Sequence, residues 1–196
     1  VEKVIGPNIL LHNTTYIIKE PRSPAFVSWH QDLTYWGFSH DDQISVWLAL
    51  SDADEISGAM YMIPGSHLEG KKEHKTIEDE NNVLFQSQSV QEFDESKKTL
   101  CSLKAGEASF HHGWTIHSSM PNKSNDRRIG FNIQYLATHV KQIKNNTDTA
   151  ICVRGVDNYN NFGIDMPADS DDLNSATIAQ QKRLQEKYKS IVSSRN

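Results

Sequence analysis

The chain has 196 residues, of which 37% are hydrophobic and 23% charged, and a formal net charge of −5 at pH 7. This composition is typical of a folded globular domain and excludes an intrinsically disordered chain. The 20 basic residues do not outnumber the 25 acidic ones, and no apolar run reaches the roughly 20 residues that cross a membrane. We therefore expect no nucleic-acid partner and no membrane partner.

Residues 1–136 predict short strands rich in Val, Ile, Tyr, Phe and Trp, separated by turns that contain Gly, Pro, Asn and Asp. The strands are expected at 14–19, 25–29, 43–50, 59–63, 99–103, 108–111, 115–118 and 128–136. In the strand 43–50 (QISVWLAL), aliphatic residues alternate with a second set that includes Ser45 and Trp47. Many short strands joined by turns predict a mainly β domain, either an antiparallel sandwich, a jelly roll or a barrel.

Two stretches outside these strands have a different character. Residues 69–98 are polar and charged and predict a long surface loop or lid, with one strand near 83–90. Residues 173–192 carry apolar side chains at helical spacing and predict an amphipathic helix that packs on the domain. We expect a single domain over residues 1–196.

The two cysteines, Cys101 and Cys152, are too few for a disulfide framework. Each lies in an apolar or β-rich run, which predicts two small buried core residues. Reduced thiols and the lack of a visible targeting segment predict a cytoplasmic protein.

The motif His30-Gln31-Asp32 follows an apolar strand and is a candidate metal site. Residues i and i+2 of a strand point to the same face, so His30 and Asp32 can hold one ion together. A second histidine would complete the two-histidine, one-carboxylate set that leaves three positions open on Fe(II) in non-haem oxygenases. The candidate is His117, and His111 and His112 lie in the same segment as alternatives.

A second H-x-D motif, His40-Asp41-Asp42, lies in a polar turn that no apolar strand leads into, so we interpret it as a solvated turn. His67 belongs to the turn Pro64-Gly65-Ser66-His67, which it is expected to fix.

Two arginines follow His117 closely enough in the sequence to be candidates for binding a cosubstrate. An iron oxygenase that uses 2-oxoglutarate needs a cation for the distal carboxylate of this cosubstrate, and the planar guanidinium of arginine binds a carboxylate through two hydrogen bonds. Arg127 and Arg128 are both candidates, and a strand would point them to opposite faces. The hydroxyl of Ser119, two residues after His117, is placed to assist.

Three segments carry a family resemblance: WHQDLTYW at 29–36, GAMYMIPGSH at 58–67 and GEASFHHGWTIHSSMPNKSNDRR at 106–128. Together they resemble the phytanoyl-CoA dioxygenase (PhyH-like) branch of the Fe(II)/2-oxoglutarate-dependent dioxygenases. The resemblance implies a double-stranded β-helix (a cupin-like jelly roll) with flanking helices. It also implies that the iron ligands are His30, Asp32 and His117. Arg128 would bind the distal carboxylate of 2-oxoglutarate with help from the Ser119 hydroxyl, and Trp47 would line the cosubstrate pocket.

The function that the resemblance implies is hydroxylation of a small molecule by O2, with Fe(II) as cofactor and 2-oxoglutarate converted to succinate and CO2. A catalytically inactive jelly-roll binding protein and a cosubstrate-independent cupin-type metal enzyme remain as alternatives. Monomers and homodimers are common in the family. Only 29 residues precede His30, so we expect an N-terminal segment to be missing, and Lys71, Lys72 and Lys75 are the basic residues available for the phosphates of an acyl-CoA.

Overall fold

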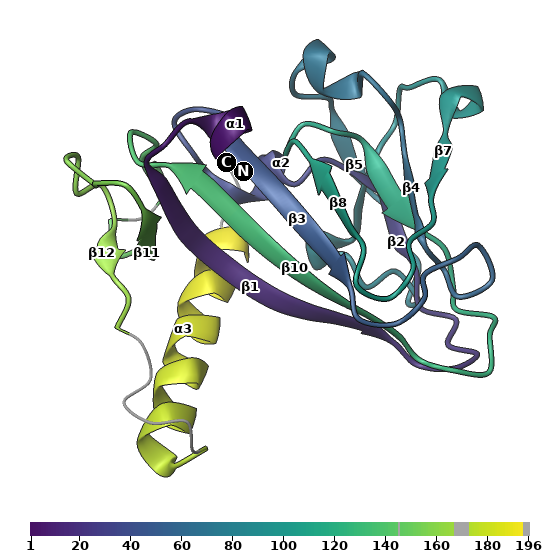
Figure 1. The fold of residues 1–196 in the computed structure, drawn as a ribbon. Helices are drawn as coiled ribbons and strands as arrows, with labels where there is room; N and C mark the ends of the chain where they lie inside the picture. The colour runs from purple at the N-terminus through teal and green to yellow at the C-terminus, as the bar shows by residue number, and fades with distance from the viewer. Residues whose placement is uncertain (145, 167–172, 194–196) are drawn as a thin grey trace.

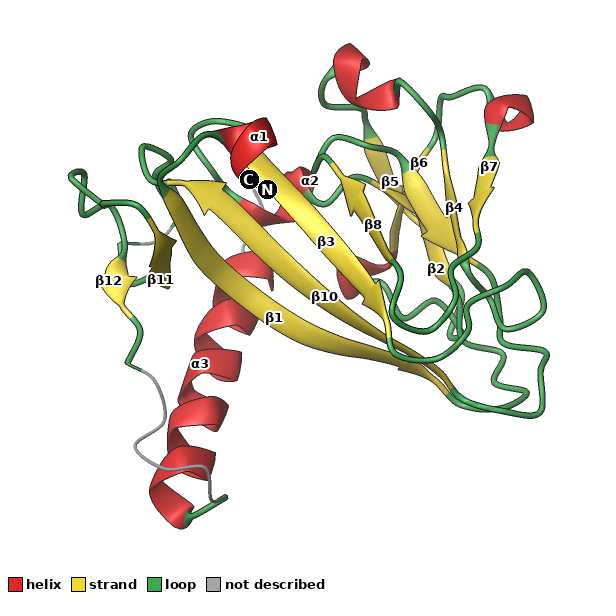
Figure 2. Cartoon of the chain, viewed as in Figure 1, coloured by secondary structure: helices red, strands yellow, loops and turns green. Residues whose placement is uncertain are grey.

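The computed structural model describes residues 1–144, 146–166 and 173–193, and most of its regular structure is β (Figures 1 and 2). The strands form a six-stranded sheet, a four-stranded sheet and a separate two-stranded sheet. This mainly β architecture, with a C-terminal helix, confirms the predicted fold class. Within the described ranges, no helix is both long and apolar enough to span a membrane.

The six-stranded sheet, which we call the major sheet, has the strand order β12-β11-β1-β10-β3-β8. Its strands are β1 (Ile9–Lys19), β3 (Gln43–Ala49), β8 (Ala108–His111), β10 (Arg128–Ala137), β11 (Thr149–Arg154) and β12 (Gly163–Ile164). β1 and β10 pair from Ile9 opposite Ala137 to Lys19 opposite Arg128, and a bulge at His12 interrupts the register between Leu11 and Asn13. The long β1–β10 ladder therefore holds Arg128 at one end and the bulge near the other.

The four-stranded sheet, the minor sheet, has the order β2-β9-β4-β7. Its strands are β2 (Val27–His30), β4 (Met60–Met62), β7 (Thr99–Cys101) and β9 (His117–Ser119). β2 and β9 are antiparallel neighbours, and their register places His30 directly opposite His117. The sheet thus brings together two histidines that lie far apart in the sequence.

Residues 69–98 contain more regular structure than a simple loop. They include β5 (His74–Thr76), β6 (Gln88–Val90) and the short 3-10 helices η2 (Phe85–Ser87) and η3 (Glu95–Lys97), and η1 (Ser66–Glu69) precedes them. β5 pairs with β6, which is the strand expected near 83–90. Ser28 Oγ of β2 donates a hydrogen bond to the Gln88 carbonyl at 2.6 Å, so this segment is anchored to the minor sheet beside His30.

Three α-helices flank the sheets: α1 (Glu2–Ile5), α2 (Leu33–Trp36) and α3 (Ser175–Ser193). The N-terminal end of α3 stands clear of the sheets in Figure 1, whereas Ile191 and Val192 near its C-terminal end are buried. Val192 packs against Leu33, Tyr35 and Trp36 of α2. The predicted C-terminal helix is therefore docked on the segment that follows the H-x-D motif.

Most predicted strands are present, and the differences have local causes. β1 begins at Ile9, well before the expected Thr14. The prediction missed this start because the polar residues His12 and Asn13 interrupt the apolar pattern. The prediction of two buried cysteines is wrong: Cys152 is exposed and Cys101 only partly buried. Cys152 lies in the half of β11 that pairs with β1 alone, since β12 reaches only Thr149 and Ala150.

Candidate metal and cosubstrate site

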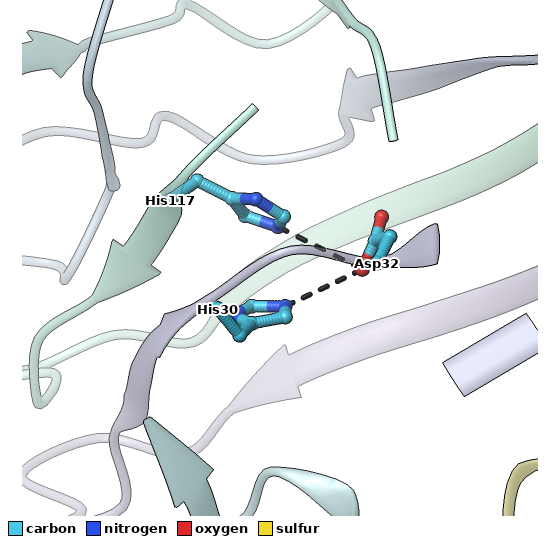
Figure 3. Close-up of side chains that lie close together, drawn as sticks. All are labelled: His30, Asp32 and His117. Carbon is cyan, nitrogen blue, oxygen red and sulfur yellow. Dashed lines mark ion pairs between the residues drawn. The ribbon is translucent and has the colours of Figure 1, made fainter. Parts of the chain in front are cut away.

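The structure brings His30, Asp32 and His117 together, although they come from β2, the start of α2 and β9 (Figure 3). One potential ligand atom from each residue lies within 4.8 Å of the other two. Asp32 Oδ1 is 3.3 Å from His30 Nε2 and 3.9 Å from His117 Nε2. Two imidazole nitrogens and one carboxylate oxygen therefore converge on one point, which is the donor set of a non-haem iron site.

Backbone carbonyls fix the orientation of both imidazoles. Nδ1 of His30 lies 2.8 Å from the Ser28 carbonyl, and Nδ1 of His117 lies 2.9 Å from the Thr115 carbonyl. Because a carbonyl oxygen only accepts, Nδ1 carries the proton in both rings and Nε2 keeps its lone pair. Hydrogen bonding of the second ring nitrogen in this way is typical of metal-ligating histidines.

The protonation states of His117 and Asp32 also suit a cation. Burial and the neighbouring charge of His30 lower the pKa of His117 to about 3, so this ring is neutral at neutral pH. Burial alone would raise the pKa of Asp32, but the charge of His117 and hydrogen bonds from His111 and His30 hold it well below its usual range. Neutral imidazoles beside an ionised carboxylate are the forms that bind a divalent metal.

The other histidines occupy different positions. His111 is buried on β8; its Nε2 lies 3.7 Å from Asp32 Oδ2, the oxygen that His30 does not approach, and its ring centroid lies 4.8 Å from that of His117. His112 is only partly buried and approaches Asp41. His40 hydrogen-bonds with Ser39 at the surface, in agreement with a solvated turn. Among these alternative histidines, only His111 reaches the carboxylate, through the oxygen that the two candidate histidine ligands do not approach.

The two arginines have opposite environments. Arg127 is exposed, and its Nε donates to Glu20 at 2.8 Å. Arg128, the first residue of β10, is 1% exposed, and within the described chain its Nε and Nη2 have no hydrogen-bond partner. These two nitrogens form one edge of the guanidinium, the edge that binds a carboxylate with two parallel hydrogen bonds. Burial lowers the pKa of Arg128 to about 10, so the group is still cationic at neutral pH.

Trp47 of β3 forms one wall beside this arginine. The Arg128 Cζ lies 5.2 Å from the centroid of the Trp47 ring, within range of a cation–π interaction. Gly130 of β10 provides the space for the indole, because a Cβ at Gly130 would overlap the Trp47 ring. Trp47 and Ser119, like Arg128, line the cavity that contains the three candidate ligands.

That cavity has a volume of about 990 Å³ and lies between the two sheets. On the major sheet it is lined by Asn13, Gln134 and His111, which belong to one polar cross-strand row that Ser45 completes between Gln134 and His111. On the other side α3 supplies Gln181, Leu184, Gln185 and Tyr188. Tyr35 and Trp36 of α2 also lie on the cavity wall.

Several lining groups escaped the sequence analysis. His12, turned inward at the bulge of β1, forms a buried pair with Asp148, with 2.9 Å between His12 Nε2 and Asp148 Oδ2. The two residues are 136 positions apart, and no local motif indicates their contact. Tyr188 was predicted only as part of an apolar helix face, yet its hydroxyl accepts a hydrogen bond from Trp36 Nε1 at 3.2 Å.

Comparisons with known proteins point to one family. A model of the family described as phytanoyl-CoA dioxygenase (PhyH) matches residues 1–130, a range that includes all three candidate ligands and Arg128. A probable alpha-ketoglutarate-dependent hypophosphite dioxygenase of Stutzerimonas stutzeri is 33% identical over 135 residues, covering 68% of this chain and 47% of the relative. The peroxisomal phytanoyl-CoA dioxygenase of Homo sapiens is 32% identical over 129 residues, covering 63% and 38%. The chain therefore spans less than half the length of these relatives.

Solved structures agree with this match. The non-heme monooxygenase ThoJ in its apo form superposes with a TM-score of 0.83 at 27% identity, over 97% of this chain and 69% of that one. A nickel complex of ThoJ superposes with a TM-score of 0.75 at 27% identity, over 95% and 68%. The similarity includes nearly the whole chain, beyond the range of the family model.

Proposed function

The chain belongs to the phytanoyl-CoA dioxygenase (PhyH) family, and on that premise we propose that it is an Fe(II)- and 2-oxoglutarate-dependent oxygenase that hydroxylates a small organic molecule. The observation that carries the proposal is that two sites share one cavity. A three-residue metal site, His30, Asp32 and His117, opens into the same space as the unpartnered guanidinium edge of Arg128. The first fits Fe(II), and the second fits the distal carboxylate of 2-oxoglutarate.

Each side chain has a definite task in this proposal. His30, Asp32 and His117 hold the metal through one face and leave three positions for cosubstrate and oxygen. Arg128 binds the distal carboxylate, Ser119 donates a further hydrogen bond to it, and Trp47 excludes water from the guanidinium. Bound iron and 2-oxoglutarate supply the oxidation of the substrate with release of succinate and CO2, while the protein orients the reactants.

The carboxylate of Asp32 favours hydroxylation as the outcome. Asp32 would occupy a coordination position on a bound iron that halogenation would need to leave open for a halide. His111 Nε2 and Ser45 Oγ lie 3.7 and 3.5 Å from Asp32 Oδ2, which keeps the carboxylate turned toward the histidines.

The cavity favours an organic substrate of moderate size. Its volume of about 990 Å³ exceeds what one metal ion and one 2-oxoglutarate fill, and the remaining wall mixes polar groups with Leu184 and Tyr188. The loop lysines weigh against an acyl-CoA: Lys72 pairs with Glu69 at 2.6 Å, Lys75 lies 3.7 Å from Glu73, and neither lines the cavity. Hypophosphite and phytanoyl-CoA are named for the relatives and are not assigned to this chain.

The test is the visible spectrum of the purified protein without oxygen, first with Fe(II) and then with 2-oxoglutarate. We expect a weak metal-to-ligand charge-transfer band that requires both additions and is lost in His117→Ala. Absence of the band from folded wild-type protein would contradict the proposal.

A matched pair of arginine variants separates the two alternatives. Arg128→Ala is expected to weaken 2-oxoglutarate binding by more than about 100-fold, because a buried bidentate charge pair is lost, whereas Arg127→Ala leaves it unchanged. A cosubstrate-independent enzyme would retain turnover in Arg128→Ala. A binding protein would show the band in the wild type but form no succinate with any member of a substrate panel.

A further inference from the structure

Lys19 is a second buried cation beside Arg128 that the proposed function does not use. It is the last residue of β1 and the direct register partner of Arg128 on β10. Lys19 is 3% exposed and Arg128 1%. The β1–β10 ladder therefore ends in two adjacent positive side chains, both removed from water.

The hydrogen bonds of Lys19 connect it to the cosubstrate pocket. Its ammonium donates to the Ser119 carbonyl at 3.1 Å and to the Met120 carbonyl. Ser119 is the last residue of β9, two positions after His117, and its side chain lines the cavity. Lys19 itself lies behind this wall, so it acts on the pocket through Ser119 and through its charge.

No carboxylate compensates these two cations. In the part of the chain that the structure describes, neither Lys19 nor Arg128 takes part in an ion pair, and Arg128 also has two unpartnered donors. Burial, followed by the charge of Arg128, lowers the pKa of Lys19 to about 7, so at neutral pH the amine is only partly protonated, and an anion bound beside it favours the charged form. Two buried like charges are unfavourable unless an anion lies beside them. This end of the β1–β10 ladder is therefore suited to binding an anion.

We propose that Lys19 is a positioning residue of the cosubstrate pocket, which holds the Ser119 end of β9 in place and adds a second positive charge behind Arg128. Together the two cations select a 2-oxo acid with a distal carboxylate over one without it. This inference rests on the proposed function, because it assigns the anion to the cosubstrate of the same site.

The experiment compares two cosubstrates by titration of the charge-transfer band without oxygen. 2-Oxoglutarate and 2-oxovalerate share the keto and carboxylate groups that chelate iron, but 2-oxovalerate has a methyl group in place of the distal carboxylate. The variants are Lys19→Met and Lys19→Gln, the latter keeping a hydrogen-bond donor without charge. Lys104→Met, at an exposed lysine paired with Asp52, is the control.

We expect both Lys19 variants to bind 2-oxoglutarate about 10- to 100-fold more weakly, the effect of removing one charge a few ångströms away in a partly buried site, and to bind 2-oxovalerate as the wild type does. A merely structural role would weaken both ligands equally and would overturn the proposal, as would unchanged 2-oxoglutarate affinity. Loss of the band in the wild type would instead contradict the proposed function. If Lys19→Met does not fold, the two affinities of Lys19→Gln test the proposal.

Discussion

Gly130 lies directly beneath the indole of Trp47, on the strand next to it, and no side chain larger than hydrogen fits between them. The glycine keeps ordinary strand geometry, so its role is steric and does not depend on an unusual φ. The indole in turn lies against the Arg128 guanidinium, with 5.2 Å from Cζ to the ring centroid. A backbone position without a side chain thus leaves the space in which Trp47 packs beside Arg128, the arginine proposed to bind the cosubstrate.

Gly130→Ala is expected to push the Trp47 ring away from β10 and to disturb Arg128. Overpacking of this kind costs about 1–3 kcal/mol of folding free energy, and we expect the Kd for 2-oxoglutarate to rise about tenfold. Band titration and urea unfolding measure the two effects. The double variant Gly130→Ala/Trp47→Phe, whose smaller ring relieves the overlap, is expected to recover part of both losses; no recovery would contradict the steric explanation.

His111 distinguishes a supporting residue from a ligand. His111→Phe removes a buried neighbour of Asp32 and is expected to lower Fe(II) affinity by no more than about 10-fold to 100-fold, the usual effect of a supporting group. His117→Ala removes a proposed ligand and is expected to abolish Fe(II) binding over the same range of Fe(II) concentrations. Anaerobic equilibrium dialysis of Fe(II) measures both. Equal loss in the two variants would place His111 among the ligands.

The His12–Asp148 pair makes stability depend on pH. Burial would raise the pKa of Asp148, but hydrogen bonds from His12 and Gln142 lower it below its ordinary value. The folded state therefore favours the ionised form of Asp148. The stability that this carboxylate contributes is complete above the ordinary pKa of a carboxyl group, about 4, and is lost as the pH falls through the pKa of Asp148 in the folded state.

Asp148→Asn is expected to reduce the free energy of unfolding by about 1–3 kcal/mol at pH 7, the loss of a charge-assisted buried hydrogen bond. The difference from wild type should shrink as pH falls below about 4. Urea unfolding at several pH values tests this, with the exposed Asp52→Asn as a control that leaves stability nearly unchanged. A difference that stays constant over this range would exclude a contribution from ionisation.

Val192 holds the end of α3 against α2. Its side chain is 4% exposed, so Val192→Asp would bury an unpaired charge and the last turns of α3 are expected to undock instead. Trypsin should then cleave faster after Arg183 or Lys187, while the charge-transfer band persists because His30, His117 and Arg128 belong to strands of the two sheets and Asp32 precedes the residues of α2 that Val192 contacts. Ser193→Asp, at an exposed neighbour, is the control. Loss of the band would show that α3 is needed to form the metal site.

The features that could be predicted from the sequence are those that depend on residues close together in the chain. His30 and Asp32 can be found because their motif is short, but the expectation that both lie on one strand is wrong: β2 ends at His30, and Asp32 begins α2 in a helical conformation. The sequence leaves Arg127 and Arg128 as two candidates, and only the family resemblance favours Arg128, the buried one of the two. The docked α3 follows from its apolar spacing.

The features that could not be predicted from the sequence depend on contacts between distant segments. The His12–Asp148 pair requires a bulge that turns His12 inward, and β-bulges of this kind leave no pattern in a single sequence. The approach of Lys19 to Arg128 follows from the register of β1 on β10, which is set by the whole ladder and not by either residue. The exposure of Cys152 depends equally on which strands cover β11.

The far wall of the cavity has a consequence for how such an enzyme can change. The family model ends at residue 130, after the ligands and Arg128, whereas β11 and α3, which close the opposite side, come later in the chain. The candidate ligands and Arg128 therefore lie in the range of the family model together with part of the cavity wall, such as Tyr35 and Trp36, whereas the wall formed by β11 and α3 is carried by a later stretch of the chain. Exchanging the C-terminal third between relatives offers a route to new substrate ranges in which the iron chemistry is inherited intact.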